Sequence, residues 1–70
     1  MNQCELILRY ILLHGSITPA EAYENLGIMR LGARIHELKK QGYNTITERE
    51  TKNNRYGNKV TYARYRIQVK

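Results

Sequence analysis

The stretch that decides the fold is residues 15–42, GSITPAEAYENLGIMRLGARIHELKKQG. Within it, Thr18 precedes Pro19, and Glu21 follows three residues after Thr18. This order is typical of a capped helix start with proline at the first helical position. Gly27 then interrupts the apolar spacing, which resumes at once. The stretch therefore predicts two helices, at about 19–26 and 29–41, joined by a tight turn.

The flanking sequence adds one helix before this pair and two strands after it. Asn2 and Glu5 have the spacing of a loose capping box, and an apolar stripe at helical spacing follows over about 3–14. After Gly42 the pattern favours strands, at about 43–49 and 60–69, with a polar loop at 50–59. These elements predict a single α+β domain over residues 1–70, a three-helix winged helix-turn-helix with a C-terminal two-stranded β-hairpin wing.

Charge is distributed unevenly along the chain. Lysine and arginine number 12 against 6 acidic residues, a formal net charge of +6. Residues 1–29 hold one arginine against three glutamates, whereas residues 49–70 hold seven basic residues against one glutamate. A basic excess of this size favours a polyanionic partner. We expect the second half of the chain to face that partner.

The second helix of a helix-turn-helix is the one that enters the major groove of DNA. With its apolar positions turned inward, the 29–41 helix is expected to show Arg30, Ala33, Arg34, Glu37 and Gln41 outward. Arg30 and Arg34 are four residues apart and so share a face, and arginine matches the O6 and N7 acceptors of guanine. The alternative is a solvated face on which Arg34 pairs with Glu37.

The polar segment between the two strands supplies the other candidates. Basic side chains on a mobile loop can reach phosphates or a neighbouring minor groove, and asparagines can donate to phosphate oxygens. An exposed tyrosine can stack or lie on a sugar. The same asparagines are also ordinary turn formers. The candidates in this segment are Lys52, Asn54, Arg55, Tyr56 and Lys59.

The sequence predicts no catalytic, cofactor or metal site. Its two histidines, His14 and His36, form no ligand set with Cys4 at metal spacing, and aspartate is absent. We expect Cys4 to be a small buried hydrophobe. The longest apolar run, Tyr10 to Leu13, is too short to span a membrane, and no signal peptide is recognised. A non-enzymatic cytoplasmic protein is the expectation.

The chain from about Gln3 to Ile67 resembles the small helix-turn-helix domains common in bacteriophage and prophage genomes. The resemblance is carried by GSITP at 15–19, RLGARIHEL at 30–38 and YARYRI at 62–67. It implies a winged helix that binds duplex DNA in a bacterial host, as a regulator or a recombination or replication accessory. It also allows a different use, an interaction with a host protein, for example as an anti-defence inhibitor. Monomer and weak homodimer both stay open.

Overall fold

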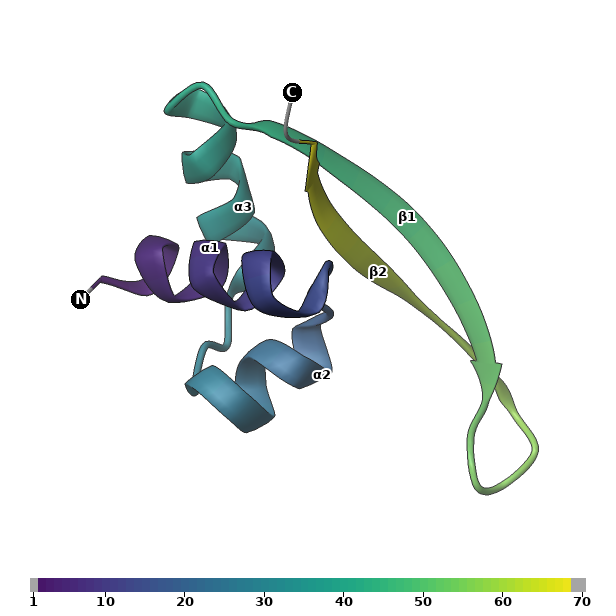
Figure 1. The fold of residues 1–70 in the computed structure, drawn as a ribbon. Helices are drawn as coiled ribbons and strands as arrows, with labels where there is room; N and C mark the ends of the chain where they lie inside the picture. The colour runs from purple at the N-terminus through teal and green to yellow at the C-terminus, as the bar shows by residue number, and fades with distance from the viewer. Residues whose placement is uncertain (1, 69–70) are drawn as a thin grey trace.

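The computed structural model describes residues 2–68, and it contains a helical part followed by a long β-hairpin (Figure 1). This architecture confirms the predicted α+β class and the order of three helices and two strands. The second helix is built from a short α-helical start and a π-helical continuation. The elements are α1 (Gln3–His14), α2 (Pro19–Glu21), η1 (Ala22–Leu26), α3 (Leu31–Lys40), β1 (Asn44–Asn53) and β2 (Lys59–Gln68).

The starts of α1 and α2 form as their sequences indicate, whereas α3 begins at Leu31, two residues later than predicted. The Asn2 side chain accepts a hydrogen bond from the Glu5 amide at 2.8 Å. At α2, the Thr18 hydroxyl accepts from the Glu21 amide at 3.2 Å, and the Glu21 carboxylate accepts from the Thr18 amide at 3.0 Å. Each bond satisfies a backbone donor that the helix itself leaves without a partner.

The first helix of the pair ends in a wider helical turn than the sequence predicts. η1 is a π-helix, and Gly27 closes it at φ 68°. The Ile28 amide bonds back to the Ala22 carbonyl at 3.0 Å. This closure directs Ile28 inward, where it is 1% exposed. A residue that the sequence placed in a surface turn is therefore part of the core.

The core lies between the helices and is covered by the base of the hairpin. Tyr65 and Ile67 of β2 pack against it as partly buried side chains. The buried apolar residues are Cys4, Ile7, Ile11, Ile17, Ala22, Ile28, Leu31, Ile35 and Leu38. No helix within residues 2–68 is long and apolar enough to cross a membrane.

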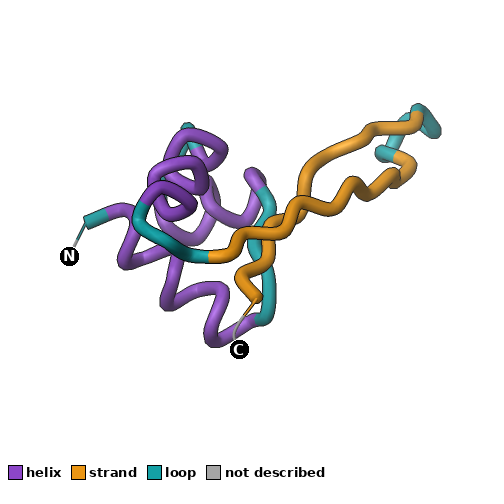
Figure 2. The backbone as a smooth tube through the Cα atoms, turned by 90° about the horizontal axis from the view of Figure 1, so that it is seen from above, coloured by secondary structure: helices purple, strands orange, loops and turns teal. Residues whose placement is uncertain are grey.

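The hairpin is attached to the helical part through the segment between α1 and α2. The Ile17 amide donates to the Tyr65 carbonyl at 2.9 Å, and the Tyr65 amide donates to the Ile17 carbonyl at 2.8 Å. β2 is thus held on one side by Ile17 and on the other by β1. Beyond this point the two strands leave the helices and project as a twisted ribbon, the wing (Figures 1 and 2).

Both strands start within one residue of their predicted positions, but β1 extends four residues further than predicted. β1 and β2 are ten residues each, in antiparallel register from Asn44 opposite Gln68 to Asn53 opposite Lys59. The loop is 54–58 rather than 50–59, and residue 69 of the expected second strand lies outside the described residues. The outer ribbon has no core on either face, so its side chains show no apolar alternation. The outer part of the ribbon is held together by backbone pairing and by a cross-strand contact between the Thr51 and Thr61 hydroxyls at 3.2 Å.

Two glycines give a matched test of this fold. Gly27 has φ 68°, so Gly27→Ala should lower the free energy of unfolding by about 1–2 kcal/mol. Gly32 is helical, and a methyl group there would lie 3.6 Å from the Tyr65 hydroxyl oxygen, an ordinary contact. Gly32→Ala should therefore stabilise the protein by up to about 1 kcal/mol. Urea unfolding measures both, and equal effects of the two substitutions would contradict the structure.

Candidate nucleic-acid interface

One face of the wing carries all of its acidic side chains, each engaged by an arginine. Residues directly opposite in an antiparallel pair share a face, so the register puts Glu48, Glu50, Arg64 and Arg66 on the same side. Glu48 pairs with Arg66, and Glu50 pairs with Arg64. Arg64 also donates to the Ser16 hydroxyl at 2.8 Å, and its hydrogen bond with Glu50 raises its pKa above the ordinary value. We call this side the paired face; the charges of these four side chains balance one another.

The opposite side, which we call the basic face, holds hydrogen-bonding side chains and no acid. Among residues 2–68, neither Arg49 nor Lys59 forms an ion pair. All members of the face are exposed, and the face continues at its inner end into Tyr65, beside Gly32 of α3. The side chains of the basic face are Arg49, Thr51, Asn53, Lys59 and Thr61.

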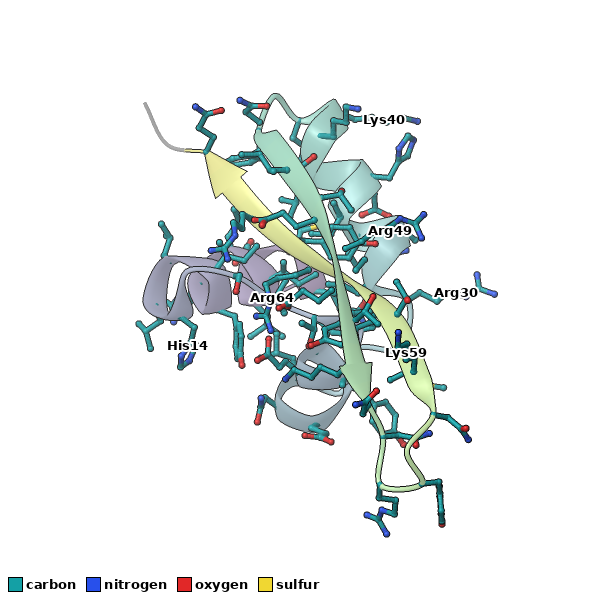
Figure 3. All side chains as sticks on the ribbon, turned by 90° about the vertical axis from the view of Figure 1, so that its right-hand side faces the viewer. His14, Arg30, Lys40, Arg49, Lys59 and Arg64 are labelled. Carbon is teal, nitrogen blue, oxygen red and sulfur yellow. The ribbon has the colours of Figure 1, made fainter. Side chains whose placement is uncertain are left out.

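The basic face and α3 are presented in the same direction. Figure 3 shows Arg30, Lys40 and Arg49 projecting to one side of the molecule, with His14 and Arg64 on the other side. The register places Lys59 on the same side of the ribbon as Arg49. Helix and wing thus contribute to one cationic surface.

The outward stripe of α3 differs from the one expected. Ala33, His36 and Lys40 are exposed at the helical spacing of one face, opposite the buried Leu31, Ile35 and Leu38. Glu37 lies at the edge of this stripe. The buried residues of α3 are the predicted ones, but its exposed stripe lies closer to the wing than the sequence predicted.

Contacts with the first turn of α1 hold Arg34 and Glu37 on one flank of α3. Arg34 bonds Glu37 at 3.1 Å, so the i,i+3 pair that the sequence left as an alternative is formed. The Cys4 sulfur lies 3.4 Å from a Glu37 carboxylate oxygen and 3.9 Å from the Arg34 carbonyl oxygen. The Arg34 Nε is buried without a hydrogen-bond partner among the described residues. Arg34 is half-buried and held on a flank of the helix.

Arg30 is placed differently from the prediction. It precedes α3 as its N-cap residue, with φ −115° and ψ 64°, and is exposed. Arg30 and Arg34 therefore do not form a pair of helical side chains one above the other. Arg30 instead extends from the turn before the helix on the α3 side of the molecule (Figure 3).

The two lysines expected on a common loop lie on opposite faces of the ribbon. Lys52 belongs to β1, on the paired face, where its Nζ is 5.9 Å from the centre of the Tyr62 ring. Lys59 opens β2 on the basic face. The strands extend further than predicted, so neither lysine is part of the loop.

The tip of the wing is organised by Asn54. Its side-chain oxygen accepts from the Tyr56 amide at 2.9 Å and from the Asn58 amide at 3.0 Å. Arg55 and Tyr56 are exposed at the tip, Tyr56 at 80%. Asn54 therefore shapes the turn, the ordinary role that the sequence also allowed.

Three exposed basic or polar residues of this surface were missed in the sequence. His36 and Lys40 could have been predicted, because they follow Ala33 by three and seven residues and therefore share its face of the helix. Arg49 could not, because its face depends on where β1 ends and how β2 is anchored. The part of the chain that the structure describes contains no group of three His, Cys, Asp or Glu side chains able to hold a metal ion.

The environment of Cys4 gives a chemical prediction. Burial raises the pKa of the Cys4 thiol, and the nearby Glu37 carboxylate raises it further. At pH 8 the native thiol should therefore react with a disulfide reagent more slowly than the urea-unfolded chain does, because the thiolate is the reactive form. Glu37→Gln should speed the native reaction, with Glu24→Gln as an exposed control. Equal native and unfolded rates would contradict this environment.

Comparison with known proteins gives one match that covers nearly the whole chain. A family model described as a winged helix-turn-helix domain matches residues 2–70. No curated protein and no solved structure matches the chain. Winged helix-turn-helix domains are typically DNA-binding modules, and the cationic surface of α3 and the wing agrees with that role. The chain belongs to this winged helix-turn-helix family.

Proposed function

We propose that the protein binds duplex DNA through the surface formed by the outward stripe of α3 and the basic face of the wing. The observation that carries this proposal is the division of charge on the ribbon. Its acidic side chains are neutralised on one face, and Arg49 and Lys59 stand on the other, toward α3. Cations without carboxylate partners are the groups that contact phosphates.

In this proposal α3 lies in the major groove and the wing follows the backbone toward the neighbouring minor groove. Gly32 and Ala33 leave little bulk at the start of α3, which favours close approach to a groove wall. In this arrangement Arg30, in the turn before α3, and Arg55, at the tip of the wing, add phosphate contacts.

The resemblance of residues 3–67 to phage and prophage domains supports a role as a regulator or a recombination or replication accessory in the cytoplasm of a bacterial host. One copy presents a complete helix and wing, so we propose that a monomer is sufficient for binding. A weak homodimer on a two-fold symmetric site is the alternative, and sedimentation with and without DNA separates the two.

Salt dependence tests the surface. Affinity for a random-sequence duplex should fall linearly on a log–log plot, by about 0.9 per phosphate neutralised. Arg49→Ala should weaken binding and reduce the slope by about one contact. Lys52→Ala removes the same charge from the paired face without releasing a carboxylate, so its slope should stay close to that of the wild type. Fluorescence anisotropy at several salt concentrations measures both.

Equal slopes for the two variants would contradict binding by the basic face. The competing proposal is that the same cations dock an acidic patch on a host protein. Capture from a bacterial lysate with and without nuclease separates the two functions. DNA binding predicts that the captured material is lost on nuclease treatment, whereas a protein complex would persist.

A further inference from the structure

We infer that His36 is the residue of α3 that reads base identity, and that it contacts a purine in the major groove. This inference rests on the proposed DNA-binding function and deepens it. It concerns a side chain that the sequence did not single out, and it replaces Arg34, which the sequence favoured for base recognition and which is held against α1.

His36 occupies an exposed position on α3. It lies on the exposed stripe, between Ala33 one turn before it and Lys40 one turn after it. Side chains near the start of a recognition helix are the ones that reach base edges. His36 is in the second turn of α3, and the small Gly32 and Ala33 beside it let the helix approach closely.

The neighbours of His36 on α3 are less suited to contact a base edge. Ala33 has no hydrogen-bonding group, and Lys40 is a flexible point charge in the last turn, which suits a phosphate. Arg34 is bonded to Glu37 against α1. Of the side chains on the outward stripe Ala33, His36 and Lys40, His36 is the one that combines an exposed position in the second turn with directional hydrogen bonding.

The imidazole matches one feature of the major groove. A neutral histidine offers one N–H donor and one acceptor nitrogen. Both purines present N7 as an acceptor in the major groove, and guanine adds O6. A single donated hydrogen bond therefore fits a purine N7 at one position and rejects cytosine, which presents the N4 donor there, while thymine O4 is the other acceptor within reach of such a donor.

The test is selection of bound sequences from a random duplex library, carried out with wild type, His36→Ala, His36→Gln and His14→Ala. His14 is the matched control because it is exposed on the other side of the molecule (Figure 3). We expect the wild type and His14→Ala to enrich the same site with one required purine. His36→Ala should lose the requirement at that position, and His36→Gln should shift it toward adenine.

A second measurement isolates the hydrogen bond. Replacing the required purine by its 7-deaza analogue removes the N7 acceptor and keeps base pairing. Wild-type affinity should fall about fivefold to tenfold, the effect of one hydrogen bond. The affinity of His36→Ala should be the same for both duplexes. Circular dichroism of each variant verifies the fold.

The outcomes separate this inference from the proposed function. Salt-dependent duplex binding with no enriched site, or with a site unchanged in both His36 variants, would overturn the role of His36 and leave DNA binding intact. A 7-deaza effect of equal size in wild type and His36→Ala would also overturn it. No duplex binding by the wild type would overturn the proposed function itself.

Discussion

The pair of backbone hydrogen bonds between Ile17 and Tyr65 determines which side chains of the wing lie on the same side as α3. It fixes one residue of β2 against the helical part. Because side chains alternate along a strand, fixing Tyr65 toward α3 also sends Arg49 and Lys59 to that side and Glu48 and Glu50 to the other. A shift of one residue in this pairing would place the acids beside α3.

The wing depends on this attachment because it has little core of its own. A two-stranded ribbon is marginally stable in water by itself. Its ion pairs are partly exposed, and each contributes at most about 1 kcal/mol. Their more important effect is electrostatic. By engaging Glu48 and Glu50, Arg66 and Arg64 remove the negative charge that would otherwise oppose a polyanion, and Arg49 and Lys59 keep their charge available.

The sequence contained enough to predict the starts of α1 and α2 and most of the core, because capping and apolar spacing act over a few residues. Thr18 with Glu21 is such a local signal, and so is the Leu31, Ile35, Leu38 stripe. It did not contain the ends of the strands, since polar residues on both ribbon faces carry no alternation. Nor could it show that Cys4, about thirty positions away, packs beside Arg34 and Glu37 and leaves Arg34 half-buried.

The central claim is that one side of the protein, formed by α3 and the basic face of the wing, contacts duplex DNA. The most direct measurement is amide chemical-shift mapping during titration with a short duplex. The account predicts perturbations at Ala33, His36, Lys40, Arg49 and Lys59, with His14 and Glu24 unaffected. Perturbations concentrated on α1 and η1, with none on α3 or the wing, would contradict it.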